Sequence, residues 1–254
     1  MKTSFLSHFL VAATVFLATA DTHAEELTCF ELRTYVANEG KLDDLHARFR
    51  DHTVSLFEKH GMTNLIYWTP VENSENLLIY LLGYPDREAR DASWKAFRND
   101  ADWKKAYESS TVDGKLVAKV DSVFLNLTDY SPTAEFPETE SELFYEMRTY
   151  TTAEGKLSNL DARFRDHTIG LFTKHGVTNL PYFHLADGQE GSENTLLYFI
   201  SAASEESRND SFKAFGADPE WKAAREASQK EGPLLVKKGV KSIFLKTTDY
   251  SPVR

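Results

Sequence analysis

The chain has 254 residues, of which 41% are hydrophobic and 13% aromatic, enough to fill one or two ordinary globular cores. Its net charge of −10 argues against nucleic acid as a partner, because phosphates need a basic surface, and against docking on anionic lipid. The single cysteine, Cys29, excludes an internal disulfide and a cysteine-based metal site. Its position just before an apolar strand favours a packed residue over a nucleophile or an intermolecular link.

The N-terminal residues have the layout of a secretory signal peptide. A positive region at Lys2 precedes an apolar run over residues 9–20, and residues 22–24 form a suitable cleavage box, with residues 18–20 as the alternative. The apolar run is short for a bilayer-spanning helix, so we disfavour an uncleaved anchor. We therefore predict a signal peptide over residues 1–24. The protein is then exported, periplasmic or secreted, with no stable membrane insertion after cleavage.

The first element predicted after this segment is a strand over residues 28–36. Successive side chains of a strand point to opposite faces. One face carries Phe30, Leu32 and Thr34, and the other carries Glu31, Arg33 and Tyr35. A turn at residues 38–40 follows.

A helix is predicted over residues 42–60. Its core-facing residues recur at steps of three and four, which places them on one helical stripe. They are Leu42, Leu45, Phe49, Thr53, Leu56 and His60. Gly61 then supplies the helix stop.

The remaining elements complete one α+β unit. Two strands, over residues 64–69 and 77–83, are joined by a polar hairpin, and Asp86 and Asp100 can cap two further helices. A last strand over residues 122–127 closes the unit. The order βαββαβ is the ferredoxin-like arrangement, whose sheet carries helices on one face only.

The whole unit occurs twice. Three motifs return 115 residues later: residues 31–35 as 146–150, 48–53 as 163–168, and 59–61 as 174–176. Both copies end in Thr-Asp-Tyr-Ser-Pro, at residues 128–132 and 248–252. This period is far longer than that of a solenoid repeat, so it indicates domain duplication.

The repeat sets the expected domain organisation. We predict a first domain over residues 27–132 and a second over residues 143–254. Residues 133–142, rich in Pro and Glu, are expected to form an extended, solvated linker.

Each sheet would leave one face without helices, and this face must meet water or a partner. Two copies in one chain can bring these faces together around a pseudo-two-fold axis. We therefore predict two tandem ferredoxin-like units that pack sheet to sheet as a dimeric α/β barrel. The protein is then a monomer with an internal pseudo-dimer, or a homodimer.

The repeated motifs resemble those of the NIPSNAP family. The resemblance rests on Glu-Leu-Arg-Thr-Tyr at 31–35, Gly-Lys-Leu at 40–42, Arg-Phe-Arg-Asp-His-Thr at 48–53, Lys-His-Gly at 59–61 and Asp-Pro-Glu-Trp at 218–221. It covers both copies. It implies the dimeric α/β-barrel superfamily, which contains cofactor-free monooxygenases, haem-handling enzymes, isomerases and domains of unknown role.

The charged face of the first strand is the main candidate site. It consists of Glu31, Arg33 and Tyr35, with Glu146, Arg148 and Tyr150 as counterparts. This face lies inside the barrel if the apolar face packs on the helices. A buried arginine is costly unless paired, so Arg33 either ties the sheets together through Glu31 or holds a ligand carboxylate or enolate in two-pronged fashion. In the second case Tyr35 can orient or protonate the ligand.

His52 and its counterpart His167 are the candidate proton-transfer residues. Each stands at the edge of the helical stripe, from where an imidazole could reach the barrel mouth as a general base. The alternative is a structural histidine bonded to a backbone carbonyl or to Asp51. His52 and His60 are eight residues apart, which is not the spacing of a metal-binding pair on one helix, so we expect no metal site.

Aromatic residues on the inner strands offer an apolar wall. Tyr67 and its counterpart Tyr182 could line a ligand pocket, although strand aromatics are more often plain core. In the second copy His184 replaces Thr69 and the following loop is longer, so the two halves are unequal.

Three functions remain open at this point, and the sequence leaves undecided whether the protein is an enzyme. The first is binding of a small anionic or carbonyl-bearing molecule in the barrel, with or without weak acid/base chemistry and without a cofactor. The second is a non-catalytic interaction module of the cell envelope, which predicts a filled barrel and an exposed apolar patch. The third is haem binding or degradation, which requires a histidine able to reach iron inside the pocket.

Overall fold

The computed structural model describes residues 26–139 and 141–253, so the predicted signal peptide lies outside the described residues. The first half contains β1 (Cys29–Ala37), α1 (Leu42–Arg48), η1 (Phe49–Thr53), α2 (Val54–Lys59), β2 (Thr63–Pro70), β3 (Leu77–Tyr84), α3 (Arg87–Asn99), α4 (Ala101–Ser110) and β4 (Val117–Leu127). The second half contains β5 (Phe144–Thr152), α5 (Leu157–Arg163), η2 (Phe164–Thr168), α6 (Ile169–Lys174), β6 (Thr178–Leu185), β7 (Thr195–Ala202), α7 (Glu205–Ala217), α8 (Pro219–Ser228) and β8 (Leu235–Thr247).

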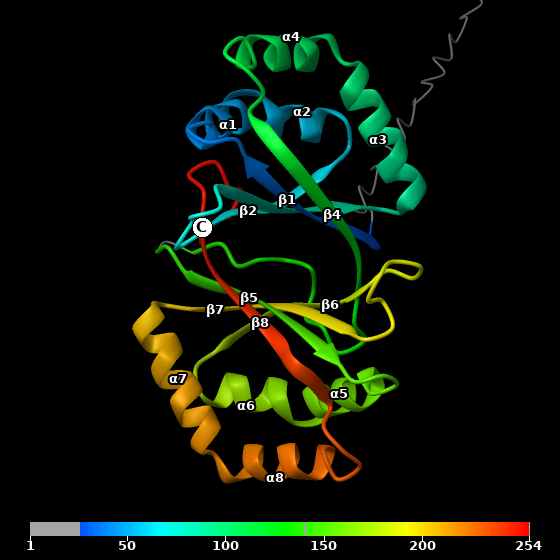
Figure 1. Ribbon diagram of the computed structural model, residues 1–254, viewed down its shortest axis with the longest axis vertical. Coiled ribbons are helices and arrows are strands. Elements are labelled where there is room, and N and C mark those ends of the chain that lie inside the picture. The colour runs from blue at the N-terminus through cyan, green and yellow to red at the C-terminus, as the bar shows by residue number, and fades with distance from the viewer. Residues whose placement is uncertain (1–25, 140, 254) are drawn as a thin grey trace, which may run out of the picture.

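The strands form one closed antiparallel barrel in the order β1-β3-β2-β8-β5-β7-β6-β4. The long strands β4 and β8 cross from one half to the other: β4 pairs with both β1 and β6, and β8 pairs with both β5 and β2. Helices α1 to α4 cover one end of the molecule and α5 to α8 the opposite end (Figure 1). The α+β class, the tandem βαββαβ halves and the sheet-to-sheet barrel are therefore confirmed.

The helix caps follow the sequence. The Asp86 carboxylate accepts a hydrogen bond from the backbone N–H of Ala89 at 2.7 Å and starts α3. Asp100 accepts from the backbone N–H of Asp102 at 2.7 Å and starts α4. In the second half Asp218 caps α8, whose first residue is Pro219. A proline fits there because the first helical N–H needs no partner within the helix.

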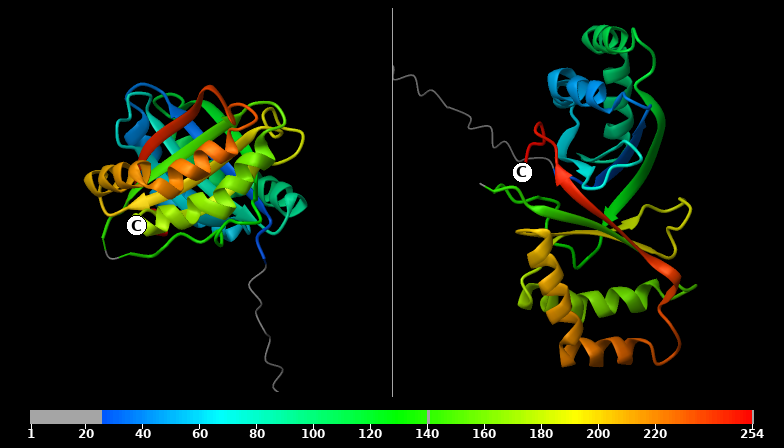
Figure 2. Two further views of the ribbon diagram at one scale, coloured as in Figure 1. Left: turned by 90° about the horizontal axis from the view of Figure 1, so that it is seen from below. Right: turned by 60° about the vertical axis from the view of Figure 1, so that its left-hand side comes forward.

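The barrel interior is filled with side chains from both halves. Trp68 of β2 stacks on Phe199 of β7 with ring centroids 4.9 Å apart. Phe136, from the segment between the halves, contacts both rings and is only 7% exposed. The composition of the linker predicted that it is solvated, and the burial of Phe136 shows that this holds only in part. It passes along the seam (Figure 2) and contributes an aromatic side chain to the shared core.

The charged face of β1 points away from this interior. Phe30 and Leu32 belong to the barrel core, whereas Glu31 and Arg33 lie between the sheet and the helices. The expectation that the charged face lines the barrel is therefore wrong. Closing two sheets face to face excludes water from the interior, so apolar residues fill it. On the other face, α3 can supply polar partners.

The helix predicted over residues 42–60 contains a π-helical segment, η1, between α1 and α2. The equivalent segment η2 lies at the same place in the second half. A π turn adds a residue and rotates the helix surface beyond it. Arg48 comes directly before η1 and is buried together with Phe49. The stripe drawn at regular helical spacing did not include this arginine.

The two halves are locked together by the Thr-Asp-Tyr-Ser-Pro segments that end each copy. Asp249, from the second copy, forms a two-pronged ion pair with Arg50 of the first at 2.8 Å. At the equivalent place Asp129 pairs with Arg165, whose Nη2 donates to both carboxylate oxygens. Each segment thus crosses to the helices of the other half, which gives these two repeated motifs a structural role.

Candidate functional site

The Glu31 carboxylate is the centre of a buried hydrogen-bond network between β1 and α3. It accepts from Arg33 Nη1 at 2.5 Å and from Arg90 Nη2 at 2.6 Å. Further donors to it are Ser122, Tyr84 and Trp94. The Glu31 side chain is fully buried. The pairing between Glu31 and Arg33 anticipated as a structural tie is therefore present, but it joins the strand to the helices and not one sheet to the other.

The partners of Glu31 decide its charge. Burial alone would raise the pKa of Glu31, but the hydrogen bonds from Arg90 and the charge of Arg33 outweigh it and lower that pKa to about 2. The carboxylate is therefore ionised at neutral pH and neutralised by two arginines. Arg33 also donates to the Tyr80 hydroxyl at 3.0 Å, and Arg90 has a second carboxylate partner in Asp91 at 2.9 Å.

Arg48 differs from Arg33 because it has no acidic partner among the described residues. It is 5% exposed, and among those residues the guanidinium makes one hydrogen bond, from Nη1 to the Ser110 hydroxyl at 3.3 Å. Its Nε has no hydrogen-bond partner. The guanidinium lies 5.3 Å from the centre of the Trp103 ring. Burial lowers the pKa of Arg48 below its usual range, as expected for a cation that lacks an anion.

Arg33 and Arg48 both line a cavity of about 190 Å³ between the sheet and the helices. Its walls are aromatic, with polar groups from the strand and the helices. They are formed by Arg33, Tyr35, Arg48, Phe49, Thr53, Phe57, Trp94, Phe97, Arg98 and Trp103. The cavity has no acidic residue in its lining, although Glu31 pairs with Arg33 behind it. Such a cavity suits a small anion with a flat apolar body.

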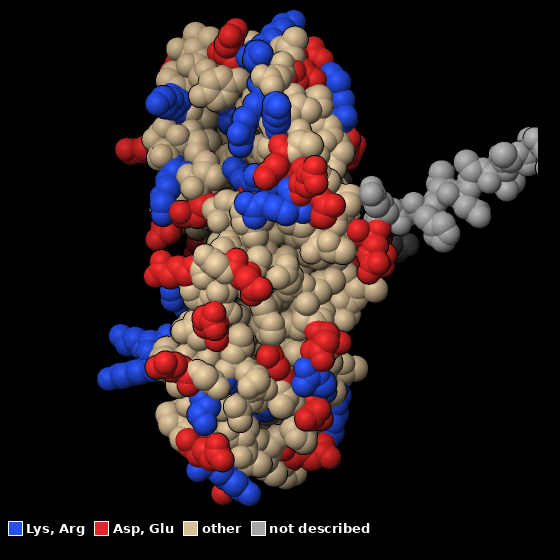
Figure 3. Space-filling model, turned by 90° about the vertical axis from the view of Figure 1, so that its right-hand side faces the viewer, with Lys and Arg blue, Asp and Glu red and all other residues tan. Residues whose placement is uncertain are grey.

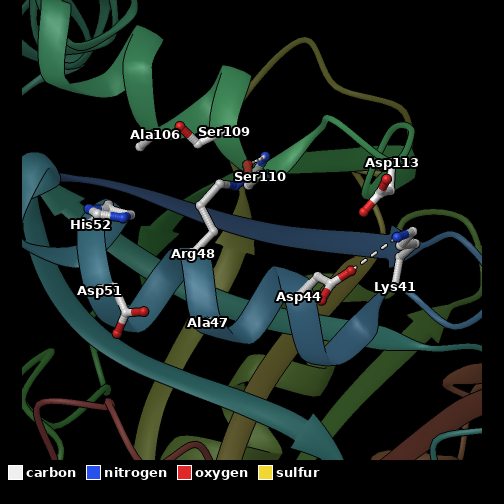
Figure 4. A pocket seen from close by; sticks show the side chains of 10 residues that line it. All are labelled: Lys41, Asp44, Ala47, Arg48, Asp51, His52, Ala106, Ser109, Ser110 and Asp113. Atoms are coloured by element: carbon white, nitrogen blue, oxygen red, sulfur yellow. Dashed lines mark hydrogen bonds and ion pairs between the residues drawn. The ribbon is translucent and has the colours of Figure 1, made fainter.

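Arg48 also forms part of a second cavity, an open groove of about 320 Å³ between α1 and α4. Figure 4 shows Arg48 rising from α1 toward Ser110, with His52 one helical turn further along. The groove also carries Asp44, Asp51 and Asp113, so its rim is acidic while its floor is the arginine. A ligand could enter here and reach Arg48 from the solvent side.

His52 is exposed on this groove and does not point into the barrel. Its counterpart His167 is likewise exposed on the helical surface of the second half. The expectation that these histidines reach the barrel mouth is therefore wrong. The segments η1 and η2 belong to the helical layers outside the barrel, and both histidines are exposed there. His52 and Arg48 nevertheless share one groove, so the structure does bring a proton-transfer candidate beside an arginine.

The remaining candidates are divided between site and core. Tyr35 lines the cavity and accepts a long contact of 3.4 Å from Arg33. Tyr67 and Tyr182 are fully buried and stack on Tyr80 and Tyr198. These two residues are core side chains on the helix side of the sheet and line neither cavity described above. The sequence does not give the order of strands in the barrel, so it could not show which aromatic residues lie next to a cavity.

Arg48, Trp94 and Trp103 were not singled out from the sequence. Two signals were available. Arg48 opens a motif that recurs at Arg163, and it directly precedes a stripe residue. The aromatic residues on the last two helices stand at helical spacing, which by itself indicates core packing as readily as a site wall.

The second half repeats the arginines with different surroundings. Arg148 pairs with Glu146 and donates to Tyr198 at 2.8 Å. Arg163 is 6% exposed, and its Nε has no partner among the described residues. Two positions differ in the wall, where Trp94 and Arg98 correspond to Phe212 and Gly216, and behind the wall Tyr84 corresponds to Ala202. The second half thus has the same buried arginines with fewer polar groups around them.

Other kinds of site find little support in the described part of the chain. Residues 26–139 and 141–253 contain no cluster of three His, Cys, Asp or Glu side chains placed to hold a metal ion. Within the same residues, no helix is long and apolar enough to cross a membrane. Acidic and basic side chains are intermixed on the face drawn in Figure 3, with no extended basic patch.

Comparisons with known proteins agree with this architecture. A family model described as NIPSNAP matches residues 30–132 and 145–252. A candidate monooxygenase from Fusobacterium nucleatum has a similar structure, with a TM-score of 0.55 at 12% identity over 87% of this chain and 93% of that one. Another from Lactobacillus acidophilus has a TM-score of 0.52 at 11% identity over 90% of this chain and 100% of that one.

A single-domain relative is also found. An uncharacterized NIPSNAP domain protein from Burkholderia xenovorans is 21% identical, with a TM-score of 0.36, over 41% of this chain and 98% of that one. No curated protein matches the chain significantly. The two structures with TM-scores of 0.55 and 0.52 are similar in fold, and at 12% and 11% identity the similarity does not extend to function.

Proposed function

The chain belongs to the NIPSNAP family, and from that premise we propose that its first half binds a small anionic molecule on Arg48. The observation that carries this proposal is the buried guanidinium of Arg48, which has an unpartnered Nε and no carboxylate paired with it among the described residues. Burying a charge without an opposite charge costs several kcal/mol. A bound carboxylate or other oxyanion would remove that cost.

The cavity walls narrow the ligand class. Trp94, Trp103 and Tyr35 surround the space of about 190 Å³ beside Arg48 and Arg33. A guanidinium binds a planar carboxylate through parallel hydrogen bonds, and aromatic walls favour a flat body. We therefore propose a compact carboxylate with a flat or aromatic body, held between sheet and helices. This replaces a site inside the barrel, which is filled with side chains.

Benzoate is a suitable probe for this proposal. We expect added benzoate to shift the indole N–H signals of Trp94 and Trp103 in the NMR spectrum of the ¹⁵N-labelled protein, because both rings line the cavity. Arg48→Gln should abolish the shifts. Arg50→Gln is the matched control: it removes the same charge two residues away, from an arginine that is exposed and already paired with Asp249. Unchanged shifts in Arg48→Gln would overturn the proposal.

A native mass spectrum of the protein purified from its own host tests for a resident ligand. A reproducible extra mass that Arg48→Gln loses would identify the ligand class. The bare chain mass, together with no response to benzoate, would favour the non-catalytic interaction module instead. The filled barrel interior is the observation that favours that second function.

Acid/base chemistry at this site would fall to His52. It shares the groove with Arg48, and imidazole accepts and donates protons near neutral pH. Tyr35 is the second candidate, because its hydroxyl lies beside Arg33 inside the cavity. Incubating a recovered ligand with wild type and His52→Gln, followed by mass spectrometry of the products, tests this. Equal conversion by both proteins would exclude a role for His52.

The haem hypothesis finds no supporting geometry. The histidines among residues 26–139 and 141–253 lie on the helices, at their ends, or on the helix-facing side of β6, as His184 does through its 2.9 Å contact with Asp161. A purified sample without a Soret band would remove this alternative.

We also propose that the protein acts outside the cytoplasm. This rests on the signal-like residues 1–24 alone. N-terminal sequencing of the protein from its host tests it, and a chain that begins at Met1 would contradict it.

A further inference from the structure

The second half contains a groove that is larger and more apolar than the groove beside Arg48, and it lies next to the unpaired Arg163. Arg163 lines a cavity of about 250 Å³ between α5 and α8. A groove of about 590 Å³ between α6 and α8 adjoins it. The two openings lie side by side and share four lining residues: Asp166, His167, Ala224 and Ala227.

The apolar character of this groove comes from three replacements between the halves. Ser55, Lys105 and Ser109 of the first half correspond to Gly170, Ala223 and Ala227 of the second. Each exchange removes a polar side chain and leaves a smaller or apolar surface. The floor is completed by Leu171 and Ala224, which are 6% exposed. Exposed apolar grooves of this kind mark binding sites for apolar groups.

The arginine end of the groove is suited to an anion. Arg163 is buried, stacks 5.2 Å from the centre of the Trp221 ring and has an unpartnered Nε among the described residues. Burial, with a smaller contribution from the charge of Arg225, lowers the pKa of Arg163. Arg225 stands where the first half has Tyr107, so the second half gains a cation at this end.

Acidic side chains limit where the head group can lie. Asp166 lines the junction between the two openings, and Glu220 lies on the apolar groove, where it pairs with Lys174 at 2.9 Å. An anionic head group would be repelled by Asp166 unless it lay on the Arg163 side. The body of the ligand would then extend past Asp166 over the alanines.

From this geometry we infer that the second half binds an amphipathic carboxylate, with its head group on Arg163 and its alkyl chain in the groove between α6 and α8. This extends the proposed function to a second site with a different ligand class. It shares with that proposal the premise of a buried, unpaired arginine, but it rests on separate residues.

Decanoate is the probe, and the chain supplies its own control for the groove. The triple variant Gly170→Ser/Ala223→Lys/Ala227→Ser introduces the residues found at the equivalent positions of the first half. A Cβ at Gly170 would meet nothing within 4 Å, so the substitution is sterically tolerated. Isothermal titration of the full chain with decanoate should show binding in wild type. In the triple variant it should weaken by tenfold or more, since each buried methylene lost corresponds to roughly a fourfold change.

The head group is tested separately. Arg163→Gln should weaken decanoate binding by about tenfold to a hundredfold, because a charge-assisted contact is lost. Decylammonium, which has the same chain and the opposite charge, should not bind measurably. Equal affinity of wild type and the triple variant, or equal binding of decanoate and decylammonium, would overturn the inference.

The two proposals fail independently. Benzoate reports on Trp94 and Trp103 in the first half, whereas decanoate reports on the groove beside Arg163. A benzoate response without decanoate binding would leave the first proposal intact and remove the second. The reverse result would do the opposite.

Discussion

Glu31 and Glu146 occupy equivalent strand positions, yet their surroundings differ. Each carboxylate accepts hydrogen bonds from its strand arginine, from an arginine of α3 or α7 and from a serine. Glu31 also accepts from Tyr84 and Trp94. The second half has Ala202 and Phe212 at those positions and lacks both donors.

The grooves outside these networks differ in the same direction. In the first half the groove beside Arg48 is rimmed by aspartates and serines. In the second half the floor of the groove that adjoins the arginine cavity consists of Gly170, Leu171 and three alanines, with charged side chains at its edge. The fold thus holds an ionised arginine–glutamate pair and a second buried arginine in both halves. The side chains around them set what each half can bind.

The largest expected effect comes from removing one of the two carboxylates. Glu31→Ala would leave Arg33 buried without an anion and Arg90 with Asp91 alone, which should lower the free energy of unfolding by about 3–5 kcal/mol. Glu146→Ala should cost less, because fewer donors lose their acceptor there. Urea unfolding of both variants at neutral pH measures the difference. An equal or larger loss for Glu146→Ala would show that the additional donors of the first half do not matter.

The contribution of Glu31 to stability should depend on pH in the acid range. The pKa of Glu31 falls from 4.5 to about 2 on folding, so the unfolded chain binds more protons between these values. The stability that this carboxylate contributes is fully present above pH 4.5 and is lost as the pH falls toward 2, about 3 kcal/mol in total. Glu31→Gln should therefore flatten the dependence of unfolding free energy on pH in this window. An unchanged slope would mean that other carboxylates dominate.

A smaller effect is expected from exchanging the ring that distinguishes the halves. Trp94→Phe introduces the residue of the second half and removes the indole donor to Glu31 and Tyr84. The unfolding free energy should fall by about 1–2 kcal/mol, because a buried acceptor loses a partner. The reverse change, Phe212→Trp, should give a smaller gain, since Ala202 offers no hydroxyl and Glu146 is left as the acceptor for the indole. A gain of similar size would contradict this account.

Much of the architecture could be predicted from the sequence, because it depends on local patterns. The repeat of residues 31–35 at 146–150 established the duplication, and the caps at Asp86 and Asp100 placed two helix starts. The alternation along the first strand separated Phe30 and Leu32 from Glu31 and Arg33. It could not tell which set faces the barrel, because a strand has the same period whichever face is inward.

The candidate site was predictable only in part for the same reason. Arg33 and Tyr35 were identified and do line a cavity, but Tyr67 and Tyr182 proved to be core. Arg48 was missed because the stripe was drawn mainly through apolar residues, although Arg48 stands three residues after Leu45 in the same helix.

The sequence by itself determined the number of units, the order of their elements and the strand positions that carry charged side chains. These depend on periodicity and on turn and cap chemistry, which act over a few residues. Tertiary structure decided which face of each sheet is dry, that Phe136 enters the barrel, and that Arg48 is buried without an acid. Those outcomes depend on the closure of one barrel from strands far apart in the chain, where burial in water-excluded space selects the apolar faces and leaves the charged ones to the helices.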